Sequence, residues 1–310
     1  MKTAELRSVK KVPFARYFRR NWSLYLFVLP ALLLMAAFQY APMYGVTIAF
    51  KKFNARQGIL GSPWVGLKHF NKFMGDPYFW QVVGNTLAIN LMDVVLGFPA
   101  PIILALLLNE VRSSRFKRAV QTISYLPHFL STMVVCGMLT NFMARDGLVN
   151  DIIAHLGGER PALLSKPELF RWIYVFSGIW QGMGWGAIIY LGAINGIDQT
   201  LYEAAAIDGC GRLRRIWHIT IPGIKAVVIT CLILHIGSML SVGADKILLM
   251  YSPGIYKTAD VISTFVYRQG LGAAEYGYGA AVGLFNSVVN IILLIASNAI
   301  CKKVADESMF

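Results

Sequence analysis

Residues 203–222 read EAAAIDGCGRLRRIWHITIP and form a polar segment between two long apolar stretches. Three successive alanines favour a slim helix, and Glu203 lies in its first turn, where the helix dipole stabilises a carboxylate. Asp208 and Gly209 break this helix, and a second segment with a cationic face follows. So specific a polar loop between two apolar stretches predicts a docking site for another protein.

The rest of the chain is too apolar for a soluble domain. Hydrophobic residues make up 56% of its 310 residues, and the mean hydropathy is +0.55. Apolar runs of about 20 residues recur, which is the length that crosses roughly 30 Å of hydrocarbon. The sequence therefore predicts an all-α polytopic membrane protein. Its six transmembrane helices are expected near 22–47, 82–108, 119–143, 170–194, 224–243 and 279–300.

These spans form one membrane domain, with no room for a separate soluble enzyme. The domain is expected over 22–301, after a basic segment 1–21 and before a short tail 302–310. The first apolar run resembles the core of a signal peptide, but it extends from Leu24 past Phe38, which is too long, and no small-residue cleavage site stands out. It is therefore predicted to be a retained span.

The net charge of +13 is better explained by membrane topology than by nucleic acid binding. With both termini inside, 17 of the 29 basic residues lie in short cytoplasmic segments that flank the spans. The positive-inside rule then predicts cytoplasmic N and C termini. The first outer loop is an imperfection, because it also holds basic residues: Lys51, Lys52, Arg56, Lys68 and Lys72.

Sequence motifs for ATP hydrolysis and for catalysis are absent. The chain contains no Gly-x-x-x-x-Gly-Lys-Ser/Thr phosphate loop, no His-Glu-x-x-His and no Gly-x-Ser-x-Gly. Its four cysteines, Cys136, Cys210, Cys231 and Cys301, lack zinc-ligand spacing and are interpreted as small packing residues. We expect a transport subunit that is not an enzyme and binds no cofactor or metal. If ATP drives the protein, a partner binds the ATP and its Mg²⁺.

The polar segment resembles the EAA loop of permease subunits of binding-protein-dependent ABC importers. That family carries Glu-Ala-Ala, three residues, Gly, nine residues and then Ile-x-Leu-Pro. This chain matches at 203–205, at Gly209 and at 219–222, with Ile221 in place of the usual leucine. The resemblance implies a type I importer permease whose loop, about 198–223, binds the cytoplasmic ATPase, although a solvated loop of ordinary helix formers is the alternative. The implied coupling residues are Glu203, Ala204, Ala205, Asp208, Gly209, Arg212 and Pro222.

The whole chain resembles the carbohydrate-uptake subset of this family, the maltose- and oligosaccharide-type permeases. The similar stretches are YLP at 125–127, YSPG at 251–254, DVIST at 260–264 and VGLFNS at 282–287. The later three resemble the branch that handles complex, polysaccharide-derived oligosaccharides. The resemblance implies oligosaccharide import by alternating access in a bacterial cytoplasmic membrane. It also implies four partners: a second, unlike permease, two ATP-binding subunits and an extracytoplasmic solute-binding protein.

Sugars need hydrogen-bond partners and flat aromatic faces, and the fourth predicted span offers both on one side. A comparison with maltose-type permeases extends this face to the third and fifth spans. The implied substrate-binding residues are His128, Thr132, Gly178, Gln181, Gly182, Trp185, His235, Met239 and Val242. The alternative for the glycines is close helix packing, because Gly178, Gly182 and Gly186 form a small-residue stripe, and an intramembrane histidine can likewise be a packing residue.

Asp93 is an acidic residue deep within a span, where a partner is expected. It is interpreted as structural, bonded to Asn90 or a histidine, with substrate contact as the alternative. Outer-loop lysines Lys51, Lys52 and Lys68 would suit an acidic, uronate-containing oligosaccharide. Two other classes stay open: an importer of the same superfamily for a polyamine, phosphate or amino acid, and an intramembrane enzyme acting on lipids or glycans.

Overall fold

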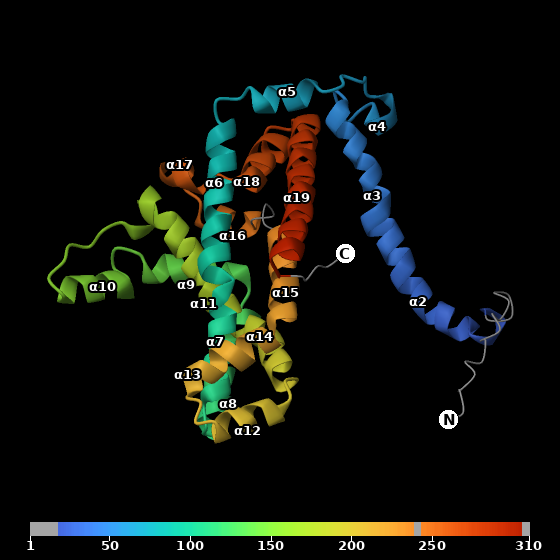
Figure 1. Ribbon diagram of the computed structural model, residues 1–310. Helices are drawn as coiled ribbons and strands as arrows, with labels where there is room; N and C mark the ends of the chain where they lie inside the picture. Colours follow the sequence, from blue (N-terminus) through green and yellow to red (C-terminus); the bar gives the residue numbers. More distant parts are fainter. Residues whose placement is uncertain (1–17, 239–242, 306–310) are drawn as a thin grey trace.

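The structure of this chain is a computed structural model that describes residues 18–238 and 243–305. In these ranges the regular structure is helical, apart from one isolated antiparallel β-bridge between Lys51 and Trp64. The helices form an elongated bundle with α5 at one end and α12 at the other (Figure 1). This confirms the all-α prediction.

Three helices are long and apolar enough to cross a bilayer, and they coincide with the first, second and sixth predicted spans. They cover Trp22–Phe50, Phe79–Glu110 and Tyr276–Lys303. The first stands apart from the bundle, and none of its most apolar window is buried, so it reaches the bundle mainly where its last turns meet α19 (Figure 1). Their elements are α2 (Trp22–Met35), η1 (Ala36–Tyr40), α3 (Ala41–Met43), η2 (Tyr44–Phe50), α6 (Phe79–Met92), η3 (Asp93–Gly97), α7 (Pro99–Glu110) and α19 (Tyr276–Ala305).

The predicted third span, 119–143, is broken rather than straight. The helix over Ser114–Phe129 meets the next one, over Thr132–Phe142, at 101°. Pro127 lacks a backbone N–H, and the chain around it tightens into a 3₁₀ turn that ends in extended backbone at Leu130. Ser131 then caps a new helix, because its Oγ accepts a hydrogen bond from the N–H of Val134 at 3.3 Å. The elements are α8 (Ser114–Tyr125), η4 (Leu126–Phe129) and α9 (Thr132–Phe142).

The predicted fifth span, 224–243, begins at a bend. Arg212–Gly223 and Lys225–Gly237 meet at 64°, and the second of these helices is α15 (Lys225–Gly237). This helix ends at Gly237, and residues 239–242, over which the predicted span continues, lie outside the described ranges. With each bent pair counted as one span, five candidate spans pass by length and composition.

The predicted fourth span lies in α11 (Pro167–Asn195), which has 29 residues and is long enough to cross a bilayer. It is not among the helices that are apolar enough by composition, because glycines, tryptophans and Gln181 occupy its middle. Instead, α11 packs against α7, α8, η3, η4 and α17.

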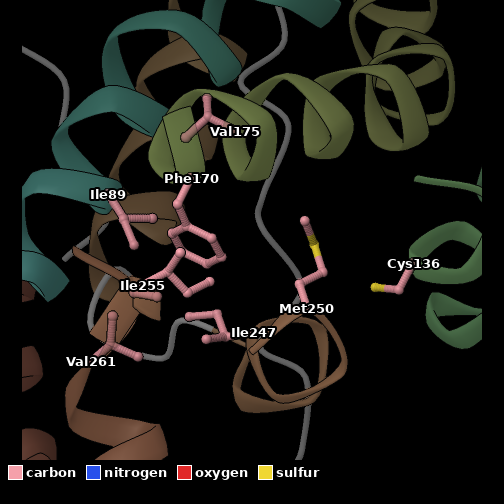
Figure 2. Packing of buried hydrophobic residues seen from close by; sticks show 9 residues of the cluster. Ile89, Cys136, Phe170, Val175, Ile247, Met250, Ile255 and Val261 are labelled. Atoms are coloured by element: carbon pink, nitrogen blue, oxygen red, sulfur yellow. The ribbon is translucent and has the colours of Figure 1, made fainter. Parts of the chain in front are cut away.

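Buried apolar residues anchor both halves of α11. Its first half carries Phe170 and Val175, which join Ile89 of α6 and Ile247 of the α16 region in one cluster (Figure 2). Its second half carries Ala187 and Ile194, which pack against α7 and the start of α15. Aromatic packing around Phe73 fastens α5, α6 and α19 at the opposite end from α12. The first two clusters hold α11 against α6, α7 and the α16 region.

Short helices complete the described chain. Two follow the first long helix, α4 (Gly58–Gly61) and α5 (Lys68–Met74). Two more, α10 (Leu148–His155) and η5 (Leu163–Ser165), project sideways before α11 (Figure 1). Between α15 and α19 lie α16 (Ala244–Met250), η7 (Pro253–Ile255), α17 (Tyr256–Ala259), α18 (Ile262–Val266) and η8 (Tyr267–Gly272).

Candidate functional site

The polar segment forms a helical hairpin at the end of the bundle opposite α5 (Figure 1). Its first arm, α12 (Gln199–Ile207), begins after Asp198, whose Oδ1 accepts a hydrogen bond from the N–H of Thr200 at 2.9 Å. This hydrogen bond lowers the pKa of Asp198, so the cap is charged at neutral pH. The arm ends where Gly209 takes a φ of +71°, a left-handed conformation that favours glycine.

The second arm returns to the bundle through α13 (Arg212–Arg215), η6 (Ile216–Thr220) and α14 (Ile221–Gly223). A hydrogen bond between the hydroxyls of Tyr202 and Thr220, at 2.9 Å, joins the two arms. Thr220 is fully buried, so this bond is shielded from solvent. The two arms are therefore joined to each other, and the hairpin connects α11 directly to α15.

Large apolar side chains are exposed on this hairpin. Ile207 is 86% exposed and Leu213 is 75% exposed, and charged side chains such as Glu203 surround them. Apolar residues rimmed by charges on a protruding element are typical of a protein-docking surface. The predicted coupling residues all lie here: Glu203, Ala204, Asp208, Gly209, Arg212 and Pro222 are exposed, and Ala205 is half-buried.

A cavity of about 290 Å³ lies between η3, α7, α11 and α15. His235 Nε2 lies 3.1 Å from Asp93 Oδ2 at its edge, so Asp93 has the histidine partner that its place in a span required. The ring of Phe98 lies 5.6 Å from that of His235. Two of the predicted substrate residues on α11, Gly178 and Gly182, expose their backbone to the same cavity.

A second group of predicted residues meets beside this cavity, at the turn before α9. The ring of His128 stacks on Trp185, with centroids 4.6 Å apart and an interplanar angle of 2°. Gln181 Nε2 donates a hydrogen bond to the carbonyl of Leu130 at 3.0 Å. Trp185 is 47% exposed, so a large part of its surface is available to a ligand.

The predicted face of α11 is thus divided between two neighbouring groups. Gly178 and Gly182 face His235 and Asp93, whereas Gln181 and Trp185 face the η4 turn. Thr132 is half-buried at the start of α9. Met239 and Val242 lie outside the described residues. Together the two groups offer a flat aromatic surface and a largely apolar cavity whose wall carries Asp93 and His235, which suits the C–H faces and hydroxyls of a sugar.

Lys246 of α16 is a further polar residue of this region that the spacing of the motifs did not select. It is 9% exposed, and its Nζ donates a hydrogen bond to the carbonyl of Tyr174 on α11 at 3.0 Å. The predicted fifth span stops at 243, which assigned this lysine to an outer loop. The sequence feature that could have identified Lys246 is the charged pair Asp245 and Lys246, which stands directly before an apolar run.

The stretch 260–264 builds a buried ion pair beside α16. Asp260, 1% exposed, accepts hydrogen bonds from Arg268 Nη2 at 2.6 Å, from the Tyr251 hydroxyl at 2.7 Å and from Thr264 Oγ1 at 2.8 Å. Burial, and then the hydrogen bond to Asp260, raise the pKa of Tyr251. This network fixes the turns between α16 and α19, which gives the family-like stretches at 251–254 and 260–264 a structural role.

Comparisons with known proteins identify relatives of almost the whole chain. Residues 97–306 match the family described as binding-protein-dependent transport system inner membrane component. The polygalacturonan/rhamnogalacturonan transport system permease protein YteP of Bacillus subtilis (strain 168) is 43% identical over 288 residues, which cover 93% of this chain and 90% of YteP. Protein LplB of the same organism is 43% identical over 306 residues, covering 98% and 96% of the two chains.

Solved structures of a bacterial ABC transporter that imports the acidic polysaccharide alginate contain similar chains. One is 39% identical with a TM-score of 0.87, and the alignment covers 94% of this chain and 99% of that one. Another, from a complex with an alginate pentasaccharide-bound periplasmic protein, is 37% identical with the same TM-score and covers 96% and 99%. The chain therefore belongs to the inner membrane components of binding-protein-dependent transport systems, and is a permease subunit of an ABC importer.

Proposed function

We propose that this permease imports oligosaccharides that carry carboxylate groups, by alternating access in the bacterial cytoplasmic membrane. The observation that carries the proposal is the pairing of an aromatic stack, His128 on Trp185, with a cavity on the same helix whose wall includes Asp93 and His235. The names of the relatives support the acidic class, because polygalacturonan and alginate are both polymers of uronic acids. The lysines around α5 add positive charge on the face where such a sugar would arrive.

The hairpin α12–α13 is proposed to receive an ATP-binding subunit. Its exposed Ile207 and Leu213 would be covered by a cleft of that subunit, and Glu203 would lie against it. Two such subunits would hold ATP and Mg²⁺, and this chain would bind neither. A solute-binding protein would deliver the sugar at the opposite end, with both termini of this chain in the cytoplasm.

The hairpin is well placed to drive the transport cycle. It is the direct connection between α11, which carries Gly178 and Gly182, and α15, which carries His235. Closure of the ATPase subunits would move the hairpin as a unit, since the Tyr202–Thr220 hydrogen bond joins its arms. Movement of the hairpin would then shift the two walls of the cavity relative to one another.

A second permease chain is proposed to complete the path. The helix over Trp22–Phe50 has no buried residue in its apolar window, so lipid or another protein must cover it. A partner of the same fold but different sequence is expected, as the resemblance to sugar importers implies. The cavity on α11 would then face the corresponding surface of that partner.

Affinity purification of the chain from its native membrane tests the coupling surface. The wild type should co-purify with an ATPase and a second permease, and Glu203→Lys should lose the ATPase but keep the permease. Glu159→Lys, on an exposed loop between α10 and α11, is the matched control and should retain both. A chain that elutes alone in every case would contradict the importer assembly.

Uptake into proteoliposomes tests the substrate class. The complete transporter with its binding protein should accumulate labelled trigalacturonate in an ATP-dependent way, and at least tenfold faster than neutral maltotriose. The reverse preference would contradict the acidic class while leaving an oligosaccharide importer in place.

A further inference from the structure

Lys246 carries a positive charge in a place where few charges are found. Its side chain comes from α16 and reaches α11, where the Tyr174 ring lies 4.7 Å below the ammonium and the Tyr174 carbonyl accepts its hydrogen bond. Among the described residues, no carboxylate forms an ion pair with it. A buried ammonium without an ion-pair partner is costly, and such a residue in a membrane protein is usually functional.

The ammonium lies close to Gly178, one of the residues of α11 that line the cavity. A Cβ atom placed on Gly178 would lie 3.6 Å from Lys246 Nζ, so the bare backbone of this glycine faces the charge. Gly178 also lines the cavity that holds Asp93 and His235. The position of α16 is well fixed, because Ile247 is fully buried in the core cluster and Lys246 O lies 3.8 Å from Cys136 Sγ (Figure 2).

The nearest acidic group is already engaged. Asp93 lies close enough to interact electrostatically with Lys246, but its carboxylate is bonded to His235. Lys246 has three N–H donors, and one of them is bonded to Tyr174. The other donors can make charge-assisted hydrogen bonds to a carboxylate that enters the cavity, and such bonds are stronger than those between neutral groups.

We propose that Lys246 binds a uronate carboxylate of the sugar during passage and so gives this permease its preference for acidic oligosaccharides. The inference rests on the proposed function and adds a residue that determines specificity. The competing role is purely structural, in which Lys246 only fastens α16 to α11.

Equilibrium binding to the assembled transporter in nanodiscs, without the solute-binding protein, separates the two roles. The probes are labelled trigalacturonate and its methyl ester, which has the same shape and no charge. Wild-type transporter should bind the acid about tenfold more tightly than the ester. Lys246→Met should lower the affinity for the acid to that for the ester and leave the ester unchanged, while Lys246→Arg should keep the preference. Lys257→Met, an exposed lysine on α17, is the control and should behave as wild type.

Three results would overturn the assignment: equal binding of acid and ester by the wild type, a preference for the acid that survives Lys246→Met, or an equal loss of both probes in Lys246→Met. The last result would indicate the structural role. The uptake assay with trigalacturonate and maltotriose is read separately. If wild-type transporter takes up maltotriose in preference to trigalacturonate, the proposed substrate class is overturned. If uptake favours trigalacturonate but the binding experiment gives one of the three results above, only the role of Lys246 is overturned.

Discussion

Trp185 illustrates at the scale of one residue how recognition and stability can be separated. Its indole stacks on His128 but remains 47% exposed. A half-exposed ring contributes less to folding than a buried one, yet it offers a flat apolar surface to the C–H face of a sugar. The same helix carries a second exposed tryptophan, Trp172, which stacks on Phe176 at 5.9 Å. The two tryptophans have similar exposure and differ in their distance from the cavity.

Replacing Trp185 with alanine should therefore weaken transport more than folding. The expected loss is about 1 kcal/mol of aromatic contact with the sugar, which is a KM for uptake roughly fivefold to tenfold higher. The measurement is sugar uptake by reconstituted transporter, with the melting temperature recorded in parallel. Trp172→Ala on the same helix should leave the KM within about twofold. Wild-type uptake by well-assembled Trp185→Ala would remove Trp185 from the site.

At the scale of elements, the glycines of α11 have different surroundings, and Gly184 lies outside the stripe of Gly178, Gly182 and Gly186. Gly178 and Gly182 border the cavity, whereas Gly184 lies against the backbone of α8. A Cβ atom on Gly184 would overlap the carbonyl of Ser124, so only glycine permits this approach of the two helices. On the far end of α11, Gly192 is exposed and a Cβ there would meet nothing.

Gly184→Ala should separate α11 from α8 and lower the free energy of unfolding by about 1–3 kcal/mol, the usual cost of overpacking. Gly192→Ala should be neutral or stabilise the helix by up to about 1 kcal/mol, since alanine is the better helix former. Thermal unfolding of the two variants in detergent measures the difference. Equal melting temperatures would contradict the close approach.

The sequence predicted elements well where local chemistry determines them. The hairpin breaks at Gly209, as the Asp-Gly pair indicated, because a left-handed residue is needed there. Hydropathy also located the three most apolar helices. It could not show the 101° bend at Leu130 or the early end of α15, because an apolar run has the same composition whether it is straight or broken. For the same reason Lys246, just beyond the predicted span, was not assigned to the site.

At the scale of the whole molecule, the α12–α13 hairpin and the cavity are separate regions, and α11 and α15 connect them. The hairpin α12–α13 lies at one end, the loop that carries Arg56 lies near the other with α5, and α11 runs between the cavity and the hairpin (Figure 1). Basic residues are abundant at the hairpin end, where Arg115 and Arg118 of α8 border a surface hollow. The positive-inside rule predicts that this end lies in the cytoplasm.

Labelling of single cysteines in intact cells tests this orientation. One variant keeps the native Cys210 in the hairpin and replaces the other three cysteines with alanine. A second variant lacks all four and carries Arg56→Cys in the loop before α5. A membrane-impermeant maleimide should label Arg56→Cys in intact cells. It should label Cys210 only in inside-out vesicles stripped of peripheral subunits, because the bilayer blocks access from outside. Labelling of Cys210 in intact cells would invert the topology and place the hairpin out of reach of a cytoplasmic ATPase.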